Sequence, residues 1–335
     1  EWDAGFNRRN FLKLMGASLA FGGLTGCTIQ PEEKIVPWVR APENMLPGSP
    51  LYYATAAAVG GAAVGLLAES HMGRPTKIDG NPQHPASLGA SHPTIQASIL
   101  DLYDPDRSQT VKNAGRISTW GGFVEGLAPG LASVQGTKGA GLRILTGAIT
   151  SPTLGRQLQD ILKSLPKARW HQFDPARGDG AELGARQAFG ESVNTYYDLS
   201  QADVVLSLDA DLFLDGPAAM RYARDFMQRR TQALHGSSAS IPNRLYVAET
   251  SPTATGSIAD HRLALDSGAI EALAMALASR LGVTVRHAGD APAFTDEAGW
   301  VDALADDLQA HSGSSAVIVG AHQSADLHAL AHAIN

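Results

Sequence analysis

The residues best placed to do chemistry are two aspartates that follow a short apolar run. Asp209 and Asp211 come directly after residues 203–208, which read DVVLSL and are typical of a buried strand. Two carboxylates at this spacing are able to bind a divalent cation or to act as a catalytic pair. Acids in such a loop more often cap a helix or form ion pairs, and Asp215 lies nearby. We therefore favour the interpretation that they cap the helix expected at residues 217–230.

A second candidate is the turn at residues 145–152, which reads LTGAITSP. It follows an expected strand and offers backbone amides and hydroxyl groups to a phosphate. Its glycine spacing does not match the G-x-G-x-x-G pattern of dinucleotide-binding loops. Ser151 as a helix N-cap, with Pro152 in the first turn, explains the turn without any ligand. We expect an ordinary strand-to-helix turn here rather than a nucleotide site.

The histidines give no stronger signal. His84 and His92 each precede a proline, and no third histidine or carboxylate lies at a spacing that would complete a metal site with them. Asp260 and His261 invite comparison with a hydrolase triad, but no G-x-S-x-G turn is present to hold a nucleophilic serine. A polar pocket of His261 and Arg262 with the hydroxyls of residues 250–257 is the other alternative. We assign none of these residues to catalysis or to metal binding.

Composition limits the classes of partner and site. The chain has 335 residues, a formal charge of −7 and a pI near 5.9. A nucleic-acid-binding surface needs a basic patch, so we expect no nucleic-acid partner. Cys27 is the sole cysteine of the sequence, which excludes disulfides and all-cysteine iron–sulfur clusters within this chain. No run of about 18 strongly apolar residues occurs, so a membrane-spanning helix is not expected.

The expected elements change from a β-rich part to an alternating α/β part. Strands are expected at residues 51–57, 63–70 and 76–79, followed by a short helix at residues 94–102. After a helix and linker at residues 116–139, strands and helices alternate, as in a parallel sheet with helical crossovers. The later strands are expected at residues 142–146, 168–173, 203–208, 244–249 and 316–320, and the later helices at residues 152–163, 217–230, 267–281, 299–309 and 324–335. This order predicts an α/β chain with a β-rich segment at residues 51–115 and a doubly wound, Rossmann-like domain at residues 116–335.

The first 27 residues contain a pattern typical of export. RRNFLK at residues 8–13 precedes a run rich in Gly and Ala, which is similar to a twin-arginine signal with Arg8 and Arg9 as its pair. LTGC at residues 24–27 also looks like a lipoprotein box, in which Cys27 would be acylated. An uncleaved signal kept as a docking helix is the alternative. Residues 28–50 contain five prolines and are expected to form an extended arm.

Residues 73–107 carry a resemblance to a known family. GRPTKIDGNPQHP at residues 73–85 and QASILDLYDPDR at residues 96–107 resemble the start of the molybdopterin oxidoreductases of the formate dehydrogenase and polysulfide reductase type. In that family a cysteine between the two phrases closes an iron–sulfur cluster. This chain has His92 near that place, and a single imidazole cannot replace the thiolates of a cluster. The resemblance implies the family's frame without this cluster.

A second phrase implies that the pterin site is also degenerate. TYYDLSQADVVLSL at residues 195–208 resembles the family's strand that ends in Gly-Ser-Asn and cradles the pyrophosphate of the pterin dinucleotide. Here Asp209 and Asp211 take that place, and like charges so close would repel the anion. Residues 173–190, where the family's metal ligand is expected, contain no cysteine, and nothing marks Ser192 as its replacement. The degenerate pterin-site positions are therefore His92, Asp209 and Asp211.

The whole combination resembles the iron–sulfur subunit of bacterial alternative complex III. ADVVLSLDAD at residues 202–211 and RLYVAETSPTATGSIADHR at residues 244–262 carry this resemblance. It implies a non-catalytic scaffold within a membrane-bound complex that oxidises quinol and passes electrons to cytochrome c or an oxidase. No cofactor is expected in this chain. Iron–sulfur clusters are expected in a C-terminal ferredoxin-like part beyond residue 335, and haem c in partner subunits.

The same resemblance implies partners and a location. The partners are a membrane quinol-binding subunit, multihaem cytochrome c subunits and the chain's own ferredoxin-like domain. The location is the periplasmic side of the bacterial inner membrane, peripheral or lipid-anchored, reached by the twin-arginine route. Two alternatives stand beside this interpretation: a catalytic molybdenum or tungsten bis-pterin oxidoreductase subunit, and a periplasmic binding lipoprotein.

Overall fold

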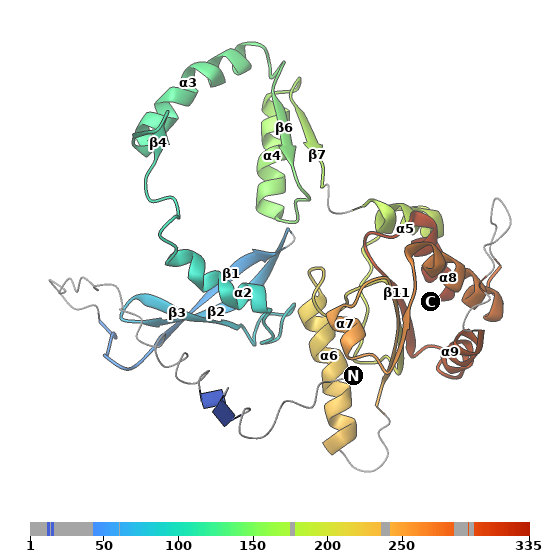
Figure 1. Ribbon diagram of the computed structural model, residues 1–335. Coiled ribbons are helices and arrows are strands. Elements are labelled where there is room, and N and C mark those ends of the chain that lie inside the picture. The colour runs from blue at the N-terminus through green and yellow to red at the C-terminus, as the bar shows by residue number, and fades with distance from the viewer. Residues whose placement is uncertain are drawn as a thin grey trace. The chain divides into compact units, whose positions relative to one another are not determined.

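The computed structural model describes residues 12–13, 15–16, 43–59, 61–174, 178–235, 242–284, 294 and 298–335 (Figure 1). The chain divides into two units, Glu1–Met45 and Leu46–Asn335, and every element named below belongs to the second. Among the described residues, no helix has both the length and the apolar character that crossing a membrane requires. Arg8, Arg9 and Cys27, the residues of the expected export signal and lipid site, lie outside the described residues.

The β-rich segment is a three-stranded antiparallel sheet, as expected. Its strands, in pairing order, are β1 (Leu51–Val59), β2 (Ala62–His71) and β3 (Arg74–Gly80). Val64, Leu66 and Ile78 are buried together with Ile95 from the helix that follows. The sheet therefore has one apolar face, which is the usual arrangement for antiparallel strands.

The helix expected at residues 94–102 is divided in two. An α-helix, α2 (Pro93–Ala97), continues as a 3-10 helix, η1 (Ser98–Leu102). The hydroxyl of Ser98 donates to the carbonyl oxygen of Ile95 at 2.6 Å, and such a local bond competes with the α-helical pattern. A small hairpin of β4 (Lys112–Asn113) and β5 (Arg116–Ile117) follows, which was not expected.

The second half contains a parallel sheet of four strands in the order β10-β9-β8-β11. The strands are β8 (Val204–Leu208), β9 (Arg244–Glu249), β10 (His261–Ala264) and β11 (Ser315–Val319). The chain moves outward from β8 to β10 and then returns to the other side of β8 to form β11. The strand order thus reverses between β8 and β11. In doubly wound folds such a reversal opens a crevice at the carboxyl ends of the strands, where ligands bind.

Helices cover both faces of this sheet (Figure 1). On one face lie α8 (Ser267–Arg280), α9 (Ala298–Ala310) and α10 (Ala325–Ile334), and on the other lies α6 (Ala219–His235). Leu206 and Leu208 of β8 point to the first face, whereas Val205 points to the second. Every residue of β8 is buried, as a central parallel strand requires. The structure confirms the α/β class and the parallel sheet.

The strands expected at residues 142–146 and 168–173 form a separate sheet instead of joining the larger one. They are β6 (Arg143–Thr146) and β7 (Arg169–Gln172), which pair in parallel. The helix α3 (Trp120–Gly136) precedes β6, α4 (Pro152–Ser164) connects β6 to β7, and α5 (Gly180–Phe189) follows β7. The local sequence pattern predicts that a strand exists but not which strand pairs with it. The expected strands are therefore present, whereas their pairing differs from the expectation of one sheet. The helix α5, the strand β10 and a short helix α7 (Ala254–Ser257) were not expected.

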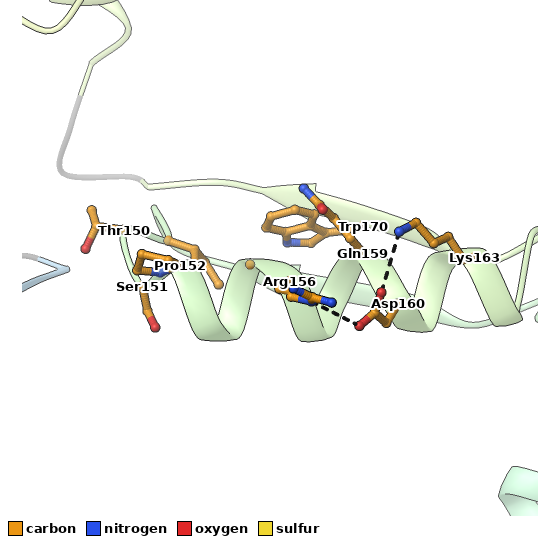
Figure 2. Close-up of a pocket in the computed structure, with 10 residues that line it drawn as sticks. Thr150, Ser151, Pro152, Arg156, Gln159, Asp160, Lys163 and Trp170 are labelled. Carbon is orange, nitrogen blue, oxygen red and sulfur yellow. Dashed lines mark ion pairs between the residues drawn. The ribbon is translucent and has the colours of Figure 1, made fainter.

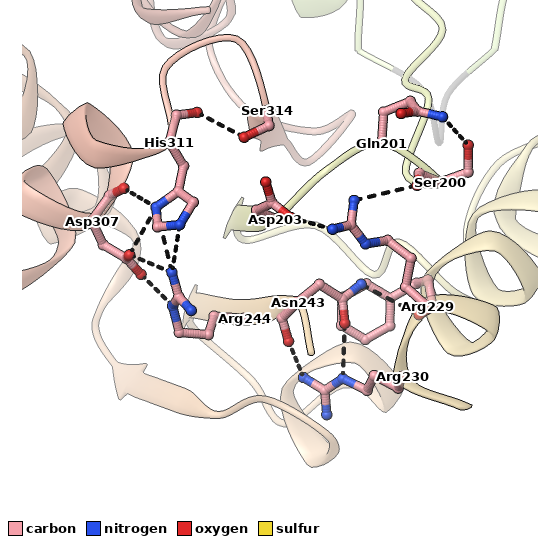
Figure 3. Close-up of polar contacts among 11 residues, drawn as sticks. Ser200, Gln201, Asp203, Arg229, Arg230, Asn243, Arg244, Asp307, His311 and Ser314 are labelled. Carbon is pink, nitrogen blue, oxygen red and sulfur yellow. Dashed lines mark hydrogen bonds and ion pairs between the residues drawn. The ribbon is translucent and has the colours of Figure 1, made fainter. Parts of the chain in front are cut away.

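Polar contacts fasten α6 and α9 to the amino-terminal edge of the four-stranded sheet (Figure 3). Asp203, just before β8, pairs with Arg229 of α6. Arg244, the first residue of β9, donates from Nε and Nη2 to the carboxylate of Asp307 in α9 at 2.7 and 2.6 Å. This bond raises the pKa of Arg244. Burial alone would raise the pKa of Asp307, but the hydrogen bonds from Arg244 and Tyr246 and the neighbouring positive charge together lower it. The opposite, carboxyl-terminal edge carries the candidate site.

Candidate functional site

The candidate site lies at the switch point of the four-stranded sheet, at the carboxyl ends of its strands. Asp209 directly follows β8, Thr250 directly follows β9, and His322 and Gln323 lie shortly after β11. Because the carboxyl ends of parallel strands meet at one edge, residues that are 41 and 113 positions apart come into contact there. The site is thus assembled by the strand order rather than by a local motif.

Four donor groups converge on the carboxylate of Asp209. Its Oδ1 accepts from the backbone N–H of Thr250 at 2.9 Å and from the Thr250 hydroxyl at 3.1 Å. Its Oδ2 accepts from Nε2 of His322 at 2.9 Å and from Nε2 of Gln323 at 2.8 Å. A carboxylate has about four lone-pair positions, so these groups use its accepting capacity fully. The Asp209 side chain is 6% exposed, whereas that of His322 is 60% exposed.

The pKa of Asp209 is lowered from its ordinary value. Burial by itself would raise it, but hydrogen bonds from the N–H of Thr250 and the ring of His322 stabilise the charged form more strongly. Asp209 is therefore an ionised carboxylate at neutral pH. Since an ionised carboxylate can only accept, His322 must carry its proton on Nε2 when it faces Asp209. The switch point holds a fixed negative charge.

The backbone of Asp209 has an uncommon conformation and packs closely against the loop after β11. Asp209 has a φ of +53°, which is uncommon outside glycine, and its N–H donates to the carbonyl oxygen of Ala248 at 2.7 Å. Gly320, which directly follows β11, approaches so closely that a Cβ there would lie 2.1 Å from the Asp209 carbonyl oxygen. Glycine is the residue that fits this approach.

Asp211 has a different partner from Asp209. Its Oδ1 accepts from the hydroxyl of Thr255 at 2.7 Å and from the Thr255 N–H at 3.2 Å. Because Thr255 lies in the first turn of α7, Asp211 caps this short helix from a neighbouring loop. The expectation that the two aspartates cap the following helix is therefore wrong: both bond to the loop after β9. Among the described residues, no group of three or more His, Cys, Asp or Glu side chains is arranged to hold a metal.

The residues around Asp260 do not assemble into a triad. Asp260 accepts from the N–H of Leu245 at 2.8 Å and pairs with Arg230. The ring of His261 instead stacks on Tyr246, with the ring centroids 4.5 Å apart. Asp260 lies just before β10, and its partners differ from that of His261, the first residue of this strand. The sequence suggested a polar pocket here, but these contacts are with the sheet itself.

Glu249, the last residue of β9, is the most deeply buried carboxylate in this region. It is 1% exposed and accepts from Nε of Arg262 at 2.5 Å and from the hydroxyl of Thr253 at 2.6 Å. Gly256 packs against it, because a Cβ on that glycine would lie 2.0 Å from Oε1. Glu249 thus joins the end of β9 to β10 through Arg262 and to the loop after β9 through Thr253.

The three histidines of the first half make separate local contacts. His92, near the expected place of the cluster cysteine, caps α2: its Nδ1 accepts from the N–H of Thr94 at 3.2 Å. His71 bonds to Glu69 at 2.8 Å. His84 lies against Gly65, where a Cβ would be 2.3 Å from its ring. These three contacts lie in different parts of the segment and do not bring the histidines together.

A cavity lies where the sequence suggested a phosphate-binding turn (Figure 2). It measures about 580 Å³ and is lined by Thr150, Ser151, Pro152, Arg156, Lys163 and Trp170, among others. Ser151 Oγ accepts from the N–H of Leu154 at 3.3 Å, so the chain caps its own helix here. Asp160 lies 3.9 Å from Arg156 and 3.6 Å from Lys163, and these pairs are largely exposed. The geometry agrees with the interpretation of an ordinary capped turn.

No family model matches the chain. The chain is 24% identical over 305 residues to the menaquinone reductase, molybdopterin-binding-like subunit, of Nitratidesulfovibrio vulgaris strain Hildenborough. The match covers 86% of this chain and 41% of that protein, so the chain spans less than half of that relative's length. The chain is thus distantly similar to a molybdopterin-binding-like subunit of a quinone reductase. The finer assignment to alternative complex III stays a proposal.

The similarity to a solved structure is weaker. A chain of the formyltransferase/hydrolase complex of Methylorubrum extorquens matches with 20% identity and a TM-score of 0.40. The match covers 63% of this chain and 55% of that chain. A likeness of this size says nothing about function.

The residues at the switch point do not fit the pyrophosphate of a pterin dinucleotide. The N–H of Thr250 and the side chains of His322 and Gln323 already donate to Asp209. A phosphate about 4 Å from this carboxylate would meet a repulsion of about 4 kcal/mol per unit charge at an effective dielectric of about 20. Sequence reasoning had singled out Asp209 but missed its three partners. Polar residues placed just after an apolar strand, as His322 and Gln323 are, were the available signal.

Proposed function

We propose that this chain is a non-catalytic scaffold subunit of a membrane-bound quinone oxidoreductase complex. The relative that is named as a subunit of a menaquinone reductase supports the membership in such a complex. The observation that carries the non-catalytic role is the fully coordinated carboxylate of Asp209 at the switch point, where a doubly wound fold would bind its ligand. A site filled by the protein's own side chain offers no donors to a pterin cofactor.

The finer proposal is the iron–sulfur subunit of alternative complex III. The phrases at residues 202–211 and 244–262 support it. In this role the chain holds a C-terminal ferredoxin-like part near a quinol-oxidising membrane subunit and multihaem cytochromes, on the periplasmic side. Iron–sulfur clusters and haem c belong to those parts. The twin-arginine-like residues Arg8 and Arg9 support the periplasmic location, and Cys27 is the proposed lipid site.

The surface of α3 supports a role that depends on a partner. No residue of this 17-residue helix is buried. Its exposed large apolar side chains are Trp120, Phe123, Val124, Leu127 and Leu131. They recur every three or four positions, so they lie along one side of the helix. Exposed apolar side chains grouped in this way are typical of interaction surfaces.

The test is a mild-detergent pull-down of the full-length protein from membranes of its native host. Partners are identified by mass spectrometry, haem by visible spectroscopy, and molybdenum, tungsten and pterin by elemental and chemical analysis. We expect haem-containing and membrane subunits to co-purify, without stoichiometric molybdenum, tungsten or pterin. Stoichiometric metal with pterin would establish the catalytic alternative instead. Purification without haem or membrane subunits would favour a periplasmic binding lipoprotein.

A surface variant sharpens this test. Phe123→Gln with Leu127→Gln removes two exposed apolar side chains of α3 while keeping good helix formers there. The scaffold proposal expects loss of co-purifying subunits with an unchanged melting temperature of the isolated chain. Glu125→Gln on the same helix is the control and should keep its partners.

A further inference from the structure

The switch point of the four-stranded sheet has the donor set of an oxyanion site. The N–H and hydroxyl of Thr250, Nε2 of His322 and Nε2 of Gln323 all point to two oxygen atoms of one carboxylate, at 2.8–3.1 Å. Converging N–H and O–H donors at the carboxyl ends of parallel strands are how such folds hold the anionic groups of ligands. Here the anion is a side chain of the same chain.

We propose that Asp209 is a built-in ligand of this oxyanion site, and that the site binds a free small carboxylate such as formate once the Asp209 side chain is removed. The donors come from the loops after β9 and β11, and Asp209 comes from the loop after β8. The donors therefore belong to other loops than Asp209, and removing the side chain of residue 209 removes none of them. The carboxylate ties three loops together, and it occupies the donors that a free anion would use.

Two further features favour this assignment over an ordinary surface hydrogen bond. The Asp209 side chain is 6% exposed, so its four hydrogen bonds replace water almost completely. An ionised group buried to this extent persists only when its accepting capacity is satisfied, as it is here. Asp209 also has a φ of +53°, a conformation that favours glycine, and the chain nevertheless carries an acid there.

The experiment is chemical rescue of Asp209→Gly in the full chain. Glycine removes the carboxylate and suits the backbone conformation, so it leaves an empty hole with its donors in place. Melting temperatures are measured in sodium formate and sodium acetate, each against sodium chloride at the same ionic strength. At formate concentrations about ten times its dissociation constant, we expect a rise of about 2 °C in the melting temperature of this variant.

Two controls separate a specific site from a general salt effect. In the wild-type protein the hole is filled by Asp209, and in Asp209→Asn it is filled by an amide of the same size, so formate should stabilise neither. Equal shifts in all three proteins, or no shift in Asp209→Gly, would overturn the proposal. If Asp209→Gly does not fold in chloride, the yield of folded protein after refolding in formate is the readout, and a variant that no carboxylate restores also contradicts the proposal. The outcome does not depend on the proposed scaffold function.

Discussion

Individual carboxylates in this chain differ in how deeply they are buried. This difference decides how much each ion pair contributes to the free energy of unfolding. Glu249 is 1% exposed and faces Arg262, whereas Glu182 is an exposed helix residue that faces Arg186 four positions later. The two pairs have similar lengths, 2.5 and 2.7 Å. Removing the cation from a buried carboxylate leaves an uncompensated charge, whereas an exposed carboxylate returns to water.

Arg262→Ala should therefore destabilise the protein far more than Arg186→Ala. Because the Arg262 side chain is itself 36% exposed, we expect a loss of about 2–3 kcal/mol, below the usual cost for a fully buried pair. For Arg186→Ala we expect at most about 0.5 kcal/mol. Urea denaturation at pH 7 gives both free energies of unfolding. Equal effects of the two substitutions would contradict this account of Glu249.

Asp209 should make stability depend on pH in the acidic range. Its pKa in the folded protein is lowered from 3.8, so folding releases a proton near that pH, and the resulting stability is present above pH 3.8. This stability is lost as the pH falls through the still lower pKa of the folded state. Asp209→Asn lacks this contribution. We expect the difference in free energy of unfolding between wild type and Asp209→Asn to shrink as the pH falls from 5 toward and below 3.8; a constant difference would exclude the effect.

At the scale of elements, the helices α5 and α10 pack unusually closely. Gly184 of α5 lies against α10, where a Cβ would be 2.5 Å from Cβ of His328 and 2.7 Å from the carbonyl oxygen of Ala325. Gln187 of α5 donates to Asp326 of α10 at 3.1 Å. Burial lowers the pKa of His328, so the ring stays neutral between these helices. The absence of a side chain on Gly184 is what lets the helices approach.

Gly184→Ala should destabilise the protein although alanine is the better helix former. The added methyl group meets backbone atoms of α10, and overpacking of this kind costs about 1–3 kcal/mol. Gly155→Ala in α4 is the matched control, because a Cβ there has nothing within 4 Å. Helix propensity alone should make that control neutral or more stable by up to about 1 kcal/mol. Thermal denaturation of both variants checks the opposite signs.

At the scale of the whole molecule, the four-stranded parallel sheet and the three-stranded antiparallel sheet follow an N-terminal segment with the features of an export signal. The twin-arginine route carries proteins that are already folded. Under the proposed function, the chain would reach the periplasmic side of the membrane by this route with its two sheets already folded.

Replacing both Arg8 and Arg9 by lysine should therefore leave the chain in the cytoplasm of its host, because receptors of this pathway read the arginine pair. Cell fractionation with immunodetection measures the distribution. Lys13→Arg keeps the pair and the local charge, so it should be exported as the wild type is. Periplasmic recovery of the double variant would show that export does not use this pair.

The amino-acid sequence by itself determined the types of most elements and the chemistry that this chain lacks. Ser151 before Pro152 predicted an N-cap that the structure confirms, since N-caps are local. The last helix was expected from residue 324, and in the structure Ser324 is its N-cap. A single cysteine excluded all-cysteine clusters without any structure. Residues 244–249 predicted β9 with its observed bounds, because a buried strand shows in its own composition.

Only the tertiary structure decided what Asp209 does. Its neighbours in sequence suggested a cap for the next helix, but its partners are Thr250, His322 and Gln323. These partners depend on β9 and β11 lying on either side of β8, and strand order is a property of long-range pairing. The same reason explains why β6 and β7 stand in a sheet of their own. Local patterns predict strands, whereas the packing of the whole core decides which strands are neighbours and which side chains meet at their ends.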